Sequence, residues 1–114
     1  MSKNENFKEV EPKDAFTMLE KHRGDKMYVP LDVRTPKEYE AGHIENATLL
    51  NIQAENFEQN LEKLDKDKTY LVYCRKGPRS TKATQLMKKH GFKEVYEIVG
   101  GFDKWKSKRL PFEK

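Results

Sequence analysis

Short apolar runs alternate along the chain with amphipathic segments of helical spacing. The runs YVPLDV, TLL, TYLVYC and VYEIV are each rich in residues that favour β-strands. Strands that alternate with helices are typical of an α/β domain built on a mainly parallel sheet. Hydrophobic residues make up 35% and charged residues 37% of the 114 residues. Because the apolar residues gather into runs, the pattern indicates a folded chain with a small core.

Proline and glycine mark the boundaries of the expected elements. Pro12 and Pro36 suit the first turns of helices, and Thr35 suits the N-cap before Pro36. Pro30 removes a hydrogen-bond donor from its strand, which should therefore be irregular or have a free edge there. We expect strands over residues 7–10, 27–33, 47–52, 69–73 and 95–99, and helices over residues 12–21, 36–40, 54–64, 80–90 and 102–106. Together they form one domain over residues 1–114, with a core from about residue 7 to about residue 112.

Charge and cysteine content exclude several classes of function. The net charge of +4 comes from 23 basic and 19 acidic residues, and this small, interspersed excess argues against a nucleic-acid partner. One cysteine cannot form an internal disulfide or a zinc site of thiolates, and the three histidines lie far apart, so we expect no metal. No apolar leader or membrane-length run is present, which predicts a cytoplasmic protein with no membrane partner.

The single cysteine, Cys74, stands where an α/β sheet binds its ligands. The strand expected over residues 69–73 delivers Cys74 at its carboxyl end, and the next predicted helix begins six residues later. Backbone N–H groups of the connecting loop and the positive end of that helix can converge on the sulfur as an anion cradle. Such a cradle favours the thiolate, the nucleophilic form, and it suits the anionic outer sulfur of a persulfide equally well.

A simpler interpretation of Cys74 is a small buried hydrophobic residue, which is what a lone cysteine most often is. A packing cysteine, however, does not require the flanking sequence Arg-Lys-Gly-x-Arg-Ser at a junction between a strand and a helix. We therefore interpret Cys74 as a nucleophile, with Arg75, Lys76 and Arg79 adding positive charge to its surroundings.

A cysteine-dependent phosphatase is a rival interpretation of the same loop. Such enzymes need the pattern C-x5-R, which leaves room for a tetrahedral phosphate. Here Arg79 follows Cys74 after only four intervening residues, and Ser80 stands where the phosphatase arginine would be. The shorter loop suits a single sulfur atom better than a phosphate.

Three sequence blocks together resemble the rhodanese family. They are LDVRTPKEYEAGHIENA, CRKGPRS and GGFDKWKSKRLP, and they occur in the family's order and at fitting separations. The resemblance extends from about Phe7 to Phe112, and the conjunction of the blocks is far more specific than any one of them. It implies a three-layer α/β fold, with a five-stranded parallel sheet, helices on both faces and an active-site loop after the fourth strand.

The resemblance also implies an activity. Members of the family transfer a sulfane sulfur atom from a donor such as thiosulfate to a thiophilic acceptor, cyanide or a thiol, through a persulfide on the position of Cys74. The expected partners are therefore a small sulfur donor and acceptor, with a thioredoxin-like or persulfide-carrying protein as a further partner, and no cofactor. The alternative within the family is a sulfur carrier or a regulatory, redox-sensing module with little thiosulfate turnover.

The resemblance assigns roles to the residues around Cys74. The active-site loop, whose amides surround the sulfur, comprises Arg75, Lys76, Gly77, Pro78 and Arg79. The first two repeat a basic pair found in members that use thiosulfate, and Arg79 matches an arginine that braces the loop.

Residues outside the loop have supporting roles in the family pattern. Asp32 and Arg34 match a block that supports the loop by hydrogen bonding, and Ser80 completes the supporting set. His43 is expected to form structural hydrogen bonds, and Trp105 is expected to pack in the core.

Pro78 is the departure from the family pattern that bears on chemistry. The residue usually found there donates a backbone N–H, which proline lacks. The cradle is therefore expected to have one donor fewer.

Overall fold

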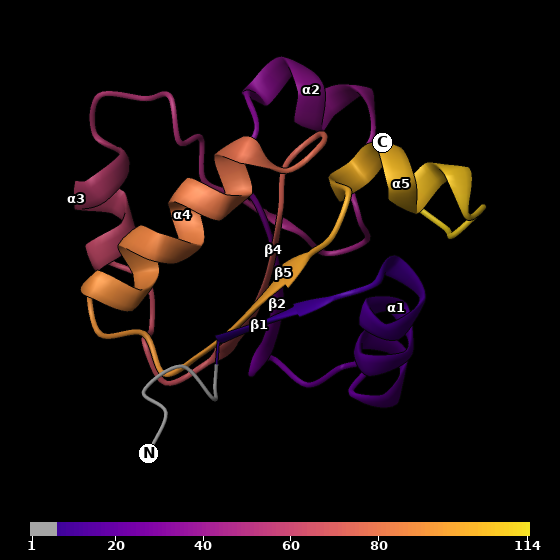
Figure 1. The fold of residues 1–114 in the computed structure, drawn as a ribbon, viewed down its shortest axis with the longest axis horizontal. Coiled ribbons are helices and arrows are strands. Elements are labelled where there is room, and N and C mark those ends of the chain that lie inside the picture. Colours follow the sequence, from indigo (N-terminus) through magenta and orange to yellow (C-terminus); the bar gives the residue numbers. More distant parts are fainter. Residues whose placement is uncertain (1–6) are drawn as a thin grey trace.

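Five parallel strands form the central sheet of the molecule. The computed structural model describes residues 7–114. The strands lie in the order β1-β5-β4-β2-β3, and every pairing is parallel. Their carboxyl ends therefore meet at one edge of the sheet (Figure 1). The strands are β1 (Phe7–Val10), β2 (Tyr28–Asp32), β3 (Thr48–Leu49), β4 (Thr69–Tyr73) and β5 (Glu94–Ile98).

Helices cover both faces of this sheet. They are α1 (Pro12–Lys21), α2 (Pro36–Ala41), α3 (Phe57–Glu62), α4 (Pro78–Lys89) and α5 (Gly101–Ser107). Helices α3 and α4 lie on one side of the sheet and α1 and α5 on the other (Figure 1). The predicted three-layer α/β fold with five parallel strands is confirmed. Over residues 7–114, no helix has both the length and the apolar character needed to cross a bilayer.

Strand β4 lies in the middle of the sheet, and all five of its residues are buried. Successive side chains of a strand point to opposite faces. Val72 accordingly packs in the core beneath α3 and α4, while Leu71 and Tyr73 pack beneath α1 and α5. Cys74 continues this alternation and packs with Val72 beneath α4. The strand period thus decides on which face the sulfur lies.

Pro30 lies in a regular part of β2, at an edge that no strand pairs. Strand β2 pairs with β4 along its whole length, including Pro30 with Leu71, whereas β3 pairs only with Leu31 and Asp32. Val33 N donates to Tyr73 O on the β4 side, and Leu50 N donates to Asp32 O on the β3 side. Because backbone groups alternate in direction, Pro30 faces the β3 side just before that pairing begins. The expected free edge is present at Pro30, and the strand is regular there.

Two expected elements are shorter than the sequence pattern predicted. The strand expected over residues 47–52 is reduced to β3, and the helix expected over residues 54–64 is reduced to α3. Asn51 ends the strand by a local turn, since its side chain accepts from Gln53 N at 2.9 Å and its carbonyl accepts from Ala54 N at 3.2 Å. Apolar spacing alone did not show this competing turn.

Helix α4 begins at Pro78, two residues earlier than the predicted start at Ser80. Proline suits the first position of a helix, because the N–H that it lacks would have no partner within the helix. The connection between β4 and α4 is therefore only residues 74–77. The positive end of α4 lies correspondingly close to Cys74.

Candidate active site

The side chain of Cys74 is completely buried, yet its sulfur has polar neighbours. Gly77 N donates to Sγ across 3.0 Å, and Ser80 Oγ lies 3.5 Å from Sγ. The remaining surroundings of the side chain are the apolar core beneath α4. A cysteine that served packing alone would not need these two hydrogen-bonding partners.

Gly77 makes the tight turn that directs an N–H group at the sulfur. Its φ of 147° lies in a region that other residues rarely adopt. An added Cβ would meet no atom within 4 Å. The backbone conformation, and not a lack of space, therefore requires glycine at this position.

Several further amides beside Cys74 are uncommitted. In the part of the chain that the structure describes, no hydrogen bond joins the N–H groups of Arg75, Lys76, Arg79 or Ser80 to another protein atom. The last two are in the first turn of α4, where N–H groups have no partner within the helix. An anion at the mouth of this turn would find donors and the positive end of a helix. Of the expected cradle, the amide of Gly77 is the one bonded to Sγ.

The beginning of α5 fixes the opposite side of the loop. Phe102 N donates to Cys74 O at 2.8 Å, and Asp103 N donates to Arg75 O at 3.0 Å. Gly101 permits this approach, since its φ is 61° and an added Cβ would lie 2.4 Å from Cys74 O. The amides at the start of one helix thus anchor the carbonyls at the start of the loop. On the surface, Arg75 Nε also lies 3.4 Å from Asp103 Oδ2.

Arg79 connects the start of α4 to α2. Its guanidinium donates to both carboxylate oxygens of Glu38, at 2.7 and 3.0 Å. Glu38 also closes a capping box with Thr35 at the start of α2. Hydrogen bonding from Arg79 is the main reason that the pKa of Glu38 falls to about 2. A charged, two-pronged link therefore holds the helix that ends the loop.

Sequence reasoning placed Arg79 in the site but did not include Glu38 among the site residues. Glu38 stands in the block that contains Asp32 and Arg34, three residues after Thr35. Its capping-box position was readable from the sequence. Its pairing with a residue 41 positions away was not.

Asp32 and Arg34 form a buried pair beneath the site. Arg34 Nη2 donates to Asp32 Oδ2 and to Gly42 O, both at 2.7 Å, and Tyr73 Oη donates to Asp32 Oδ2 at 2.9 Å. These hydrogen bonds hold Tyr73, the residue before Cys74, and none of them reaches residues 75–79. The expected support of the loop by these two residues is therefore indirect in the structure.

The ionisation of this buried cluster follows from its contacts. Burial opposes the charge of Arg34, but the hydrogen bond and the charge of Asp32 outweigh it and raise the pKa of Arg34. Burial first, and then the charge of Asp32, raise the pKa of Tyr73. The phenol therefore keeps its proton and donates a hydrogen bond to the carboxylate of Asp32. The cluster is a fixed support and not a source of protons.

The remaining predicted residues occupy distinct positions. Lys76 is exposed and forms no ion pair with any residue between 7 and 114. His43 Nδ1 lies 2.8 Å from Tyr39 O, a structural contact. Trp105 is buried, and its Nε1 donates to Pro111 O at 2.9 Å. Neither aromatic residue has a contact with the sulfur.

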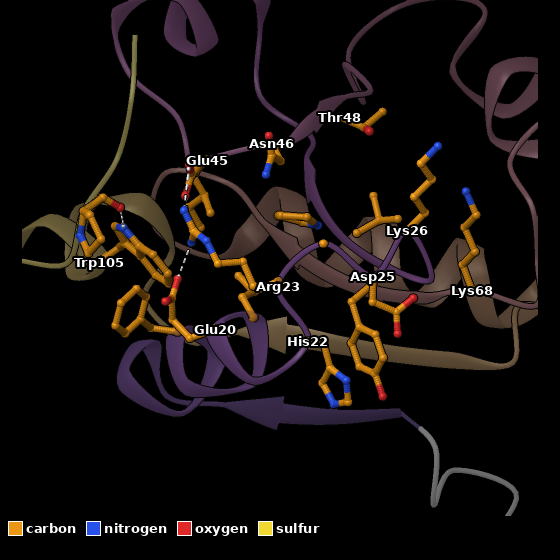
Figure 2. A pocket seen from close by; sticks show the side chains of 18 residues that line it. Glu20, His22, Arg23, Asp25, Lys26, Glu45, Asn46, Thr48, Lys68 and Trp105 are labelled. Atoms are coloured by element: carbon orange, nitrogen blue, oxygen red, sulfur yellow. Dashed lines mark hydrogen bonds and ion pairs between the residues drawn. The ribbon is translucent and has the colours of Figure 1, made fainter.

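A hollow of about 500 Å³ lies apart from Cys74, between α1, the start of β2 and the segment after α2. Its lining includes none of residues 74–79, and its Arg23 is already paired with Glu20 and Glu45 (Figure 2). Within residues 7–114, no group of three or more histidine, cysteine or carboxylate side chains could hold a metal ion.

Comparison with known families agrees with this geometry. A match to the family described as "Rhodanese-like domain" covers residues 15–108, which includes most of α1, the whole loop around Cys74 and α5. The chain belongs to the rhodanese family. Its single buried cysteine stands at the position where the rhodanese pattern has its reactive cysteine.

The individual relatives cover between 68% and 93% of this chain. The protein named thiosulfate sulfurtransferase GlpE, from Coxiella burnetii, is 37% identical over 101 residues, which are 89% of each chain. The protein YqhL of Bacillus subtilis is 40% identical over 78 residues, 68% of this chain and 60% of that protein. A rhodanese-related protein of Thermoplasma volcanium superposes with a TM-score of 0.78 at 27% identity, over 93% of this chain and 97% of that one. This rhodanese is thus a homologue of a single-domain thiosulfate sulfurtransferase.

Proposed function

We propose that this rhodanese moves a sulfane sulfur atom from thiosulfate to cyanide or a thiol through a persulfide on Cys74. The observation that supports this most is the environment of the sulfur. Gly77 N–H donates to Sγ, and four uncommitted amides lie at the same turn beside the positive end of α4. An anionic sulfur is the species that such donors stabilise.

The reaction has two steps that share one site. The thiolate of Cys74 attacks the outer sulfur of thiosulfate, a new S–S bond forms, and sulfite leaves with the electron pair of the broken S–S bond. The acceptor then attacks the outer sulfur of the persulfide and regenerates the thiolate, so that cyanide leaves as thiocyanate. Splitting the transfer in this way predicts ping-pong kinetics.

The charges around the loop suit both steps. Lys76 is exposed beside the turn and attracts an anionic donor. Arg79 and Glu38 hold the start of α4, so the uncommitted amides keep one arrangement while sulfur arrives and leaves. No metal or cofactor enters either step.

The complete burial of Cys74 favours a second candidate, a carrier that receives sulfur only when a partner opens the loop. Thioredoxin-like and persulfide-carrying proteins are the partners of that chemistry. Such a carrier would accept sulfur from a persulfide and would turn over thiosulfate poorly.

Thiocyanate formation from thiosulfate and cyanide tests the proposal. We expect the wild type and Lys82→Ala, a change at an exposed position of α4, to form thiocyanate at similar rates, and Cys74→Ser to form none. Turnover that persists in Cys74→Ser would overturn the proposal. Absence of turnover in the wild type, with sulfur accepted from a protein persulfide, would replace it with the carrier.

A further inference from the structure

The hydroxyl of Ser80 lies between three groups that could accept its proton. Its Oγ is 2.8 Å from Glu97 Oε2, 2.9 Å from Gly77 O and 3.5 Å from Cys74 Sγ. A hydroxyl has one proton to donate and two lone pairs with which to accept. Which of the three groups receives the proton therefore decides whether Ser80 presents a proton or a lone pair to Cys74 Sγ.

Glu97 is the strongest of these acceptors. It lies on β5, and its Oε2 also accepts from Thr81 Oγ1 at 2.7 Å, so two hydroxyls of the first turn of α4 converge on one carboxylate oxygen. Hydrogen bonds to an ionised acceptor are about twice as strong as those between neutral groups. Gly77 O is neutral and already accepts from Thr81 N at 3.0 Å. The Ser80 proton is therefore directed at the carboxylate.

This direction has a consequence for Cys74. When Ser80 donates to Glu97, it turns a lone pair toward Sγ and can only accept a hydrogen bond from that side. A thiol can donate to that lone pair, whereas a thiolate has nothing to donate. The carboxylate and a thiolate thus compete for the one proton of Ser80.

We propose that Glu97 is a positioning residue that holds the hydroxyl of Ser80 away from Cys74 and so opposes formation of the thiolate. The inference rests on the proposed function, in which Cys74 is the nucleophile. A thiol at rest is protected from alkylation and oxidation, and a thiolate that is harder to form is a stronger nucleophile once formed. Glu97 thereby sets the balance between a protected and a reactive cysteine.

Other charges face this network from each neighbouring element. On β1, Glu9 is the register partner of Glu97, and Lys8 borders the same small surface hollow as Glu97. On α4, the hydrogen bond to Glu38 and, among the smaller causes, the charge of Cys74 raise the pKa of Arg79. On the β4 side, Glu97 pairs in register with the apolar Val72. These groups are the same in every variant compared below, so differences between variants report on Glu97 and Ser80.

The ultraviolet absorbance of the thiolate, followed against pH, tests the inference. Because the chain has one cysteine, subtracting the matched Cys74→Ser protein isolates the signal of Cys74. We expect Glu97→Gln to move the midpoint of thiolate formation to lower pH by about one unit, so that the thiolate fraction well below the midpoint rises about tenfold. Thr81→Val removes the other hydroxyl that donates to the same carboxylate. This change should move the midpoint of thiolate formation by less than about a third of a pH unit.

A second pair of variants separates the hydroxyl from the charge alone. In a Ser80→Ala background, Glu97→Gln should move the midpoint by only about a third of a unit, because the transmitting hydroxyl is gone. An equal shift in both backgrounds, or a shift of the wild-type midpoint to higher pH, would overturn the inference. Glu97→Ser, a small neutral change at a partly exposed position, gives the same comparison if Glu97→Gln does not fold.

These measurements do not depend on sulfur transfer. If Cys74 forms no persulfide but the midpoints move as expected, the proposed function fails and the role of Glu97 stands. If the persulfide forms and the midpoints do not move, Glu97 has no such role and the proposed function stands.

Discussion

Two arginines follow Cys74 in the active-site loop, and their different partners predict different effects of removing them. Arg79 makes a two-pronged, partly buried link to Glu38, whereas Arg75 lies 61% exposed and 3.4 Å from Asp103. We expect Arg79→Ala to lower kcat/KM for thiosulfate by about tenfold and Arg75→Ala by about twofold, because exposed pairs contribute little. Steady-state rates decide the ranking, and equal losses would contradict it.

Lys76 is the exposed cation nearest to the sulfur along the chain that has no ion-pair partner within residues 7–114. Removing it should weaken attraction of the dianionic donor without moving the loop. We expect Lys76→Ala to raise the KM for thiosulfate about fivefold with kcat nearly unchanged. Added salt should reduce the difference. Lys82→Ala, an equal loss of charge farther along α4, should leave KM unchanged, and a similar rise there would show that only net charge matters.

At the scale of elements, the approach of α5 to the loop of Cys74 depends on Gly101. An added Cβ would lie 2.4 Å from Cys74 O and 2.6 Å from Arg75 O, both of them backbone atoms. Gly91 offers a matched control, because its φ is also positive, at 86°, but a Cβ there would meet nothing within 4 Å. The two glycines thus separate the cost of backbone conformation from the cost of the close approach.

We expect Gly91→Ala to lower the free energy of unfolding by about 1 kcal/mol, the cost of a positive φ. Gly101→Ala should lower it by about 3 kcal/mol or more and should also reduce sulfur transfer, because the carbonyls that begin the loop must move. Urea unfolding and a thiosulfate assay of both proteins check this. Equal effects of the two changes would mean that the contact between α5 and the loop is not tight.

The order of the elements and the place of Cys74 were predictable from the sequence, because both depend on local patterns. Strand β4 is a continuous apolar run, and Cys74 directly follows its last residue, at the carboxyl end of the strand. The ends of β3, α3 and α4 were not predicted correctly, since local turns decide them. The turn at Asn51 and the helix start at Pro78 compete with apolar spacing.

The partners of the site residues were less accessible to sequence reasoning. Glu38 meets Arg79 from α2, and Glu97 meets Ser80 from β5, across separations of 41 and 17 positions. Such contacts depend on how separate elements pack, and a single sequence does not show them. From the sequence alone, a carboxylate in a strand is interpreted as a solvated side chain. Its hydrogen-bond partner becomes known only when the position of the neighbouring helix is known.

At the scale of the whole molecule, the link between α2 and α4 predicts how stability changes with pH. The pKa of Glu38 falls from 4.5 to about 2, chiefly through its hydrogen bond from Arg79. Because the pKa is lower in the folded chain, the stabilisation is fully present above about pH 4.5 and is lost as the pH falls toward about 2. Solvent screening limits this contribution to about 1 kcal/mol.

Glu38→Gln should therefore be less stable than the wild type by about 1 kcal/mol at neutral pH, and the two should converge as the pH falls from about 4.5 to about 2. Chemical unfolding at several pH values measures the difference. Glu40→Gln, at an exposed position of the same helix, should run parallel to the wild type at every pH. A constant gap between Glu38→Gln and the wild type would show that the ion pair does not stabilise the fold.

Intact mass after incubation with thiosulfate examines the chemistry of Cys74 most directly. The persulfide mechanism predicts that the wild type gains the mass of one sulfur atom and loses it again when cyanide is added, while Cys74→Ser gains nothing. A wild-type protein that never gains this mass, or the same gain in Cys74→Ser, would contradict a sulfur-carrying role for this cysteine.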